Sequence, residues 1–232
     1  MIQKTRRKTA ARTASIRNEA SVSELRIGGV PQSDAENAAI MHATKQRLID
    51  AGLRMLLAQG YNSLGLQTLL TETGIPKGSF YHHFKDKEDF ALQVIDSYIT
   101  AVHAGLDECL KDHERPPLER VRHFFELTQQ KYQEDGYLGC LMGGLGQELS
   151  GVSEVFRQKI EWCFSTIAER VANCLQEARE RNEVPPGCDV CQMADLLVDC
   201  WEGAALRSRL RRNPTSLDAM LDFYIRSVRL VA

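Results

Sequence analysis

The sequence predicts an all-α protein on three observations. Apolar residues recur at helical spacing from Glu36 onward, clusters of glycine and proline separate these segments, and the residue alternation that marks a strand is absent. No apolar run reaches the roughly 18 to 20 residues that a membrane-spanning helix needs, and no apolar signal core follows the N-terminus. We therefore expect a cytoplasmic protein without a membrane partner.

The first third of the chain is basic, although the whole chain has a net charge of −2. Residues 1–90 hold 13 Lys and Arg against 9 Asp and Glu, and the first 17 residues hold six cations and no acid. Few of these first side chains could be buried, so we expect residues 1–37 to form a disordered basic arm that tethers the protein to DNA. A solvated tail and an organellar transit peptide, which has a similar composition, are the alternatives.

Three helical segments follow the arm, and a tight turn joins the last two. The first, an amphipathic helix, ends near Gly60, and a short helix comes next, from about Leu66 to Thr73. Gly74 supplies the left-handed turn after the short helix, and Pro76 suits the first turn of another helix because its missing N–H would be unpaired there. This spacing predicts a helix-turn-helix.

The second helix of this motif has one buried face and one open face. Phe80 and Phe84, four residues apart, point inward, and Gly78 lets a partner approach the backbone closely. Asp86 caps the next helix, and Lys87 at the start of that helix places a cation beside free backbone N–H groups. The arrangement suits phosphate groups.

The rest of the chain repeats the helical pattern. Residues 156–178 predict a long helix with one buried stripe. Residues 193–204 and 217–231, on either side of Pro214, predict an antiparallel pair of helices.

Seven cysteines stand at positions 109, 140, 163, 174, 188, 191 and 200. Their odd number and the lack of a secretory signal predict reduced thiols. Cys163, Cys174 and Cys200 fall in the apolar stripes, so we expect them in the core. Cys188 and Cys191 form a C-x-x-C pair, but a metal ion needs about four ligands and no second pair accompanies them, so we expect no metal site.

The segment "GYNSLGLQTLLTETGIPKGSFYHHFKDKEDF" resembles the DNA-binding domain of the TetR family of bacterial transcriptional regulators, and the match covers about Ala43 to Phe90. The resemblance implies a homodimer, with a three-helix DNA-reading domain at residues 38–90 and a helical domain for ligand binding and dimerisation at residues 91–232. The family usually has Thr or Ser near the start of the short helix, where this chain has Leu64 and Gly65.

The resemblance also assigns residues to DNA by their position in the motif. Lys77, Ser79 and His83 would face bases or the adjacent backbone in the major groove, while Tyr81 and Lys87 would hold phosphates. The full set of predicted DNA contacts is Gln67, Thr68, Lys77, Gly78, Ser79, Tyr81, His83 and Lys87.

Two further segments, "GYLGCLMGGLGQE" and "WEGAALRSRL", are similar to a branch of TetR regulators that answer reactive electrophiles or small unsaturated carbonyl compounds. In some members of that branch the cysteine of the Gly-Cys-Leu segment is a sensing thiol, and Cys140 holds this place. A thiol at the start of a helix has a lowered pKa. The resemblance thus predicts a ligand or sensing site that includes Cys140, Trp201 and Arg209. Alternatively, Cys140 is only a small residue that lines a pocket.

The sequence therefore predicts a homodimeric repressor that binds a palindromic DNA operator and is released by a small-molecule or electrophilic inducer. The prediction requires no cofactor and no catalysis. One alternative is a thiol-dependent redox enzyme or carrier that uses Cys140 or the Cys188–Cys191 pair. Another is a helical interaction protein whose basic arm binds nucleic acid without sequence preference.

Overall fold

Residues 34–229, which the computed structural model describes, form nine α-helices and no strand, so the predicted all-α fold is confirmed. The helices are α1 (Asp34–Gln59), α2 (Leu66–Thr73), α3 (Lys77–His83), α4 (Lys87–Leu110), α5 (Pro117–Glu134), α6 (Leu141–Leu149), α7 (Glu154–Glu180), α8 (Val190–Arg211) and α9 (Thr215–Val228). The basic arm lies outside the described residues, except for its last four positions, which begin α1. No helix in residues 34–229 is long and apolar enough to span a membrane.

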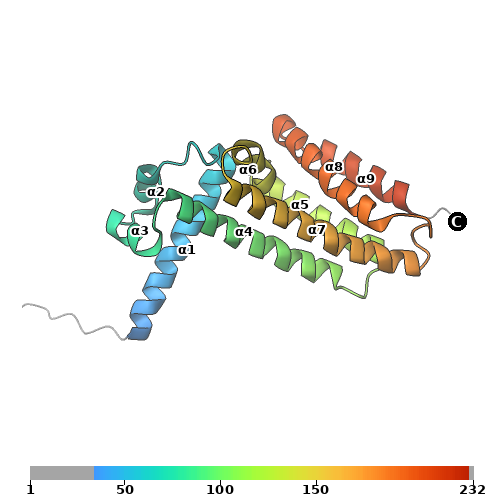
Figure 1. Cartoon of the computed structure of the whole chain (residues 1–232), viewed down its shortest axis with the longest axis horizontal. Helices are drawn as coiled ribbons and strands as arrows, with labels where there is room; N and C mark the ends of the chain where they lie inside the picture. Colours follow the sequence, from blue (N-terminus) through green and yellow to red (C-terminus); the bar gives the residue numbers. More distant parts are fainter. Residues whose placement is uncertain (1–33, 230–232) are drawn as a thin grey trace, which may run out of the picture.

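Helices α1, α2 and α3 pack around the start of α4 at one end of the molecule (Figure 1). Phe80, Phe84 and Phe90 form the centre of this core, with ring centroids 4.9 to 5.4 Å apart. Gly52 lets α1 cross α4 closely, because a Cβ atom there would lie 2.4 Å from the Phe90 ring. Burying each Phe side chain contributes about 1.5–3 kcal/mol, so these three rings hold the small domain together.

The helix-turn-helix has the turn that the sequence predicts. Gly74 ends α2 in the left-handed conformation, with φ of 65°, and Pro76 is the N-cap of α3. The Asp89 N–H donates to the side chain of Asp86, the N-cap of α4, at 2.8 Å. These caps fix the orientation of α3 between α2 and α4.

The remaining helices form an elongated body. Helices α4, α5 and α7 run along its length, and α8 and α9 lie side by side as the predicted antiparallel pair (Figure 1). The long helix predicted at residues 156–178 is α7. The expected domain boundary after residue 90 falls inside α4, so the predicted DNA-reading domain and the body share that helix. Cys140 and Ile167 pack against the cores of both parts.

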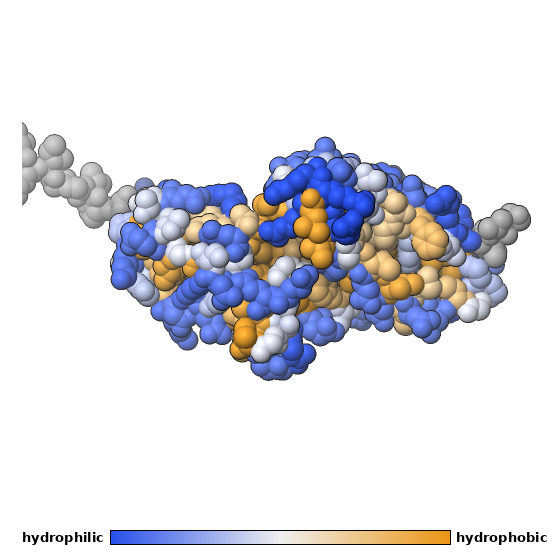
Figure 2. Space-filling model, turned by 90° about the horizontal axis from the view of Figure 1, so that it is seen from above, coloured by the Kyte–Doolittle hydropathy of each residue, from blue (hydrophilic) through white to orange (hydrophobic). Residues whose placement is uncertain are grey.

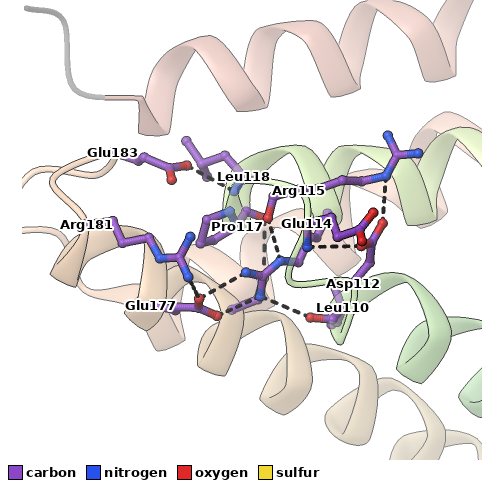
Figure 3. A network of polar contacts seen from close by, with 11 residues as sticks. Leu110, Asp112, Glu114, Arg115, Pro117, Leu118, Glu177, Arg181 and Glu183 are labelled. Carbon is purple, nitrogen blue, oxygen red and sulfur yellow. Dashed lines mark hydrogen bonds and ion pairs between the residues drawn. The ribbon is translucent and has the colours of Figure 1, made fainter.

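A buried arginine joins three helices at the far end of the body (Figure 3). The Arg120 guanidinium in α5 donates to both oxygens of the Glu177 carboxylate in α7, at 2.7 and 3.0 Å. It also donates to the carbonyl oxygens of Arg115 and Leu110, at 2.9 and 3.2 Å. Since an unpaired buried charge is costly, this network ties the end of α4 and the start of α5 to α7.

Candidate DNA-binding surface and ligand cavity

The predicted DNA contacts lie on α2, on α3 and at the start of α4. Gln67 and Thr68 are exposed on α2, and Lys77, Gly78 and Tyr81 are exposed on α3. The Lys77 Nζ lies 5.8 Å from the centre of the Tyr81 ring, so the two residues share one patch. Tyr81 keeps 48% of its surface exposed, although the neighbouring Phe80 is fully buried. The two helices thus present a polar surface over an aromatic core.

Ser79 and His83 are partly buried at the edge of this surface. Burial lowers the pKa of His83, and the nearby His82 and Lys45 lower it further. The imidazole of His83 is therefore neutral at neutral pH and carries one donor and one acceptor nitrogen. Lys45 of α1 adds a cation beside α3, since its Nζ lies 5.9 Å from the centre of the Phe84 ring. This residue was not among the predicted contacts.

Lys87 lies at the start of α4 as expected, but the loop between α1 and α2 holds its side chain. Its Nζ is 4.5 Å from the centre of the Tyr61 ring and donates to the carbonyl oxygen of Asn62 at 3.4 Å. Leu64 is buried and Gly65, the N-cap of α2, provides no side-chain cap. Because Gly65 has no side-chain hydroxyl, it cannot accept a hydrogen bond from the first N–H groups of α2.

The carboxylate of Glu148, in the last turn of α6, binds the same loop. The N–H groups of Tyr61 and Asn62 donate to the Glu148 carboxylate at the end of α6, at 2.8 and 2.6 Å. Gly60, with φ of 77°, makes room for this contact, because a Cβ atom there would lie 2.5 Å from Glu148 Oε2. The sequence analysis did not single out Glu148, although the quoted Gly-rich segment ends on it. It connects α6 directly to the DNA-reading domain.

A cavity of about 520 Å³ lies at the other end of α6 and is lined by residues of α1, α4, α5, α6, α7 and α8. Its walls are mostly apolar, and its aromatic members are Tyr98, Phe124, Phe125, Tyr132, Phe164 and Trp201. Trp201, a predicted ligand residue, is only 3% exposed, and its ring lies 4.7 Å from the ring of Phe125. The Trp201 Nε1–H donates to the Tyr132 hydroxyl at 3.5 Å. A cavity of this size and lining suits a small organic molecule.

Cys140 is the N-cap of α6 and lines this cavity. Burial and the carboxylate of Glu202 raise the pKa of its thiol well above the ordinary value. The predicted lowering of this pKa is therefore wrong. The partial charge at a helix start is small, and here it does not offset the loss of solvent and the approach of an acid. The thiol remains protonated at neutral pH.

Glu202, on α8, is the acid beside Cys140. Burial raises the pKa of the Glu202 carboxyl to about 7, although a hydrogen bond from Cys140 opposes this shift. A Cβ atom on Gly143 would lie 2.1 Å from Glu202 Oε2, so the carboxyl rests against the first turn of α6 where only glycine leaves space. The sequence analysis missed Glu202, although it directly follows Trp201 in a quoted segment.

Arg209 lies two turns further along α8 and has a different partner. Its Nη2 donates to the carbonyl oxygen of Ala58 in the last turn of α1, at 3.4 Å. Its aliphatic stem packs over Gly139, where a Cβ atom would lie 3.8 Å from Arg209 Cβ. Glu202, rather than Arg209, therefore provides the charge next to the Cys140 thiol. Arg209 instead connects α8 to the DNA-reading domain.

The other cysteines divide between core and surface. Cys163 and Cys174 are buried as predicted, and burial raises the pKa of Cys163 to about 12 and that of Cys174 to about 11. The prediction for Cys200 is wrong, because Leu197 and Trp201 carry the buried face of α8 and leave Cys200 exposed beside it.

The C-x-x-C pair lies where α8 begins. Cys188 is partly buried and Cys191 is exposed. Asp189, between them, caps the helix by accepting hydrogen bonds from the N–H groups of Cys191 and Gln192, both at 3.1 Å. Within residues 34–229, no group of three or more His, Cys, Asp or Glu side chains is arranged to hold a metal ion.

Two family matches cover both parts of the chain. Residues 48–94 match the family described as bacterial regulatory proteins, tetR family. Residues 117–224 match the family described as Tetracyclin repressor-like, C-terminal domain.

Several known proteins are similar to the chain over most of its length. The transcriptional regulator AcuR of Cereibacter sphaeroides is 36% identical over 184 residues, which cover 79% of this chain and 83% of AcuR. The HTH-type transcriptional repressor DhaR of a Mycobacterium species is 31% identical over 177 residues, which cover 76% of this chain and 88% of DhaR.

Solved structures agree with these matches. The crystal structure of a regulatory protein TetR from Rhodobacter sphaeroides has a TM-score of 0.76 and 35% identity, and the alignment covers 79% of this chain and 97% of that one. The crystal structure of the reduced form of Escherichia coli NemR has a TM-score of 0.72 and 26% identity, covering 81% of this chain and 98% of that one.

Proposed function

Since the chain belongs to the TetR family of bacterial transcriptional regulators, we propose that it is a homodimeric repressor that binds a palindromic operator and releases it when a small molecule enters the cavity beside Cys140. The observation that carries this proposal is the position of α6. This helix borders the cavity at its first residues and holds the loop of the DNA-reading domain at its last.

In this proposal α3 enters the major groove. Base edges can be contacted by its exposed N-terminal half and by the neutral His83. Phosphates can be contacted by Tyr81 and Lys87. Gln67 and Thr68 on α2 would contact the backbone beside the groove. A repressor acts where its operator is, so this function belongs to the bacterial cytoplasm.

An exposed seam on α8 supports the homodimer. The seam consists of Leu196, Cys200, Gly203, Leu206 and Leu210. These positions are three or four residues apart, as in the contact face of two packed helices, and Gly203 lets a second helix approach closely. On α9, Phe223 keeps 67% of its surface exposed. Apolar side chains gather on the face where α8 and α9 lie (Figure 2).

A second copy of the chain is the partner that this seam fits. Two copies related by a two-fold axis would place two α3 helices on one side of the dimer, which matches the symmetry of a palindromic operator.

Release would follow from a shift of α6. A ligand beside Cys140 and Glu202 contacts the first turn of α6, and Glu148 at the last turn holds the N–H groups of the loop after α1. That loop in turn positions Lys87 through the carbonyl oxygen of Asn62. A ligand that prefers another position of α6 would therefore favour a spacing of the two reading domains that does not fit the operator.

The raised pKa of Cys140 favours a reversibly bound ligand over an electrophile, and it also disfavours an enzyme that uses the Cys140 thiol. Both of those reactions need the thiolate as nucleophile. The pKa of Cys140 lies well above its ordinary value, so little thiolate is present at neutral pH.

The proposal is tested by selecting bound sequences from random double-stranded DNA with the purified full-length protein. We expect enrichment of an inverted repeat that unrelated DNA does not displace. Binding that unrelated DNA displaces equally well would instead indicate a protein that binds nucleic acid without sequence preference.

A further inference from the structure

The carboxyl group of Glu202 lies in the wall of the cavity, and no cation of residues 34–229 forms an ion pair with it. Burial raises the pKa values of Tyr98 on α4, Tyr132 on α5, Cys140 on α6 and Cys163 on α7, and the charge of Glu202 raises them further, so all four groups lie near it. All four are neutral at neutral pH. Within the described residues, Glu202 takes part in no salt bridge.

An enclosed carboxylate without a cation is unfavourable, and it has two ways to lower that cost. It can take up a proton, or a positive charge can bind next to it. Arg209, on the same helix, lines the adjoining pocket together with Glu202, but its Nη2 is bonded to the carbonyl oxygen of Ala58 at the end of α1. A ligand can supply the charge.

The aromatic walls also favour a cation. Phe125, Tyr132 and Trp201 pack together beside Glu202, with ring centroids 4.7 and 6.2 Å from that of Trp201. The faces of such rings attract positive charge most strongly where water is excluded. The apolar part of the cavity toward α1 and α4 would hold the uncharged body of a ligand.

The other charged groups that line the cavity do not reverse this preference. Asp50 of α1 and Asp135 after α5 are acidic, and Lys131 is paired with Asp135 at 3.6 Å. A carboxylate ligand would therefore be repelled by Glu202 and two further acids, and the single lysine in the lining is already paired.

We propose that the cavity binds apolar amines and that the carboxylate of Glu202 pairs with the ammonium group of the ligand. This assignment rests on the proposed function, in that the amine would be the inducer. Glu202 is then the residue that determines the charge of the ligand, and anionic molecules of the same size are excluded.

The test compares three matched probes by calorimetric titration at pH 8, where Glu202 is ionised. Phenylbutylamine is a cation, phenylbutanol is neutral and phenylbutyrate is an anion. We expect the wild-type protein to bind the amine at least about tenfold more tightly than the alcohol, and to bind phenylbutyrate more weakly than either. The Glu202→Gln variant should bind amine and alcohol alike, whereas Glu169→Gln, which removes an exposed carboxylate from α7, should behave as wild type.

A second measurement uses only the wild-type protein. Between pH 8 and pH 5 Glu202 becomes protonated, so amine affinity should fall about tenfold or more while alcohol affinity stays constant. The four groups around Glu202 have raised pKa values above this range and do not titrate in it.

Two results would overturn the assignment. One is tighter binding of phenylbutyrate than of the amine, and the other is an amine preference that persists in Glu202→Gln, which would point to Asp50 or Asp135. A failure of the proposed function would give a different result from a failure of the cation site. Amine binding that depends on Glu202 but leaves operator affinity unchanged would support the cation site and contradict the release step.

Discussion

The Tyr61 N–H donates a hydrogen bond to the Glu148 carboxylate at 2.8 Å, and this contact joins the DNA-reading domain to α6. Asn62 donates to the other oxygen of the same carboxylate at 2.6 Å. A single side chain of the body thus fixes the loop between α1 and α2.

Replacing Glu148 by glutamine should loosen this loop. A glutamine side chain has one acceptor oxygen for two N–H groups, so one of them exchanges its protein partner for water, at a cost of about 0.5–1.5 kcal/mol of unfolding free energy. We expect faster hydrogen exchange of the Tyr61 and Asn62 amides in Glu148→Gln and no change in Glu169→Gln. Equal exchange rates in wild type and Glu148→Gln would mean that the contact does not restrain the loop.

The partly buried carboxyl of Glu202 makes stability depend on pH. Its pKa is about 7 in the folded protein against an ordinary 4.5, so the folded state holds the proton more tightly and stability falls as pH rises between these values. The full difference is about 3 kcal/mol at most. Urea unfolding should show Glu202→Gln gaining stability relative to wild type from pH 5 to pH 8. The variant removes this dependence alone, so a constant difference between the two proteins would contradict the assignment.

The seam on α8 and the exposed ring on α9 should hold the dimer. Leu210 and Phe223 keep 66% and 67% of their surfaces exposed in one chain. Placing a charge at either position in a dimer core is costly, so Leu210→Glu and Phe223→Glu should sediment as monomers at micromolar concentration. Val152→Glu changes an even more exposed side chain, at 77%, in the connection between α6 and α7 and should remain dimeric. A dimer that survives both changes would require another interface.

The cysteines should react in an order set by exposure and ionisation. Cys191 and Cys200 are exposed in one chain, whereas Cys140 is partly buried and has a raised pKa. Because the proposed dimer covers Cys200 in the α8 seam, limiting maleimide should label Cys191 first, and Cys140→Ser should leave the labelling pattern unchanged. Peptide mapping that finds the first adduct on Cys140 would restore the electrophile-sensing hypothesis.

Local features of this fold are predictable because they depend on residues that are neighbours in the chain. The turn at Gly74 needs a left-handed residue, and Asp86 caps α4 through the N–H of Asp89 three positions later. The four-residue spacing of Phe80 and Phe84 likewise predicts the buried face of α3.

The chemistry of the cavity is less predictable because it depends on residues far apart in the sequence. The pKa of Cys140 is raised by burial and then by the distant Glu202, and the loop at Tyr61 is held by Glu148. Helix α8 carries apolar residues on two faces, so periodicity alone placed Cys200 in the core although it is exposed. The DNA contacts and the basic arm remain predictions.

If α3 reads a specific operator, changes on its exposed face should lower the affinity of the full-length protein for the selected inverted repeat, measured by fluorescence anisotropy. We expect Lys77→Ala and Tyr81→Phe to weaken binding by about 1–3 kcal/mol each. The His82→Ala variant, which changes an exposed side chain on the same helix outside the predicted contacts, should bind as wild type. Unchanged affinity in both Lys77→Ala and Tyr81→Phe would contradict the account.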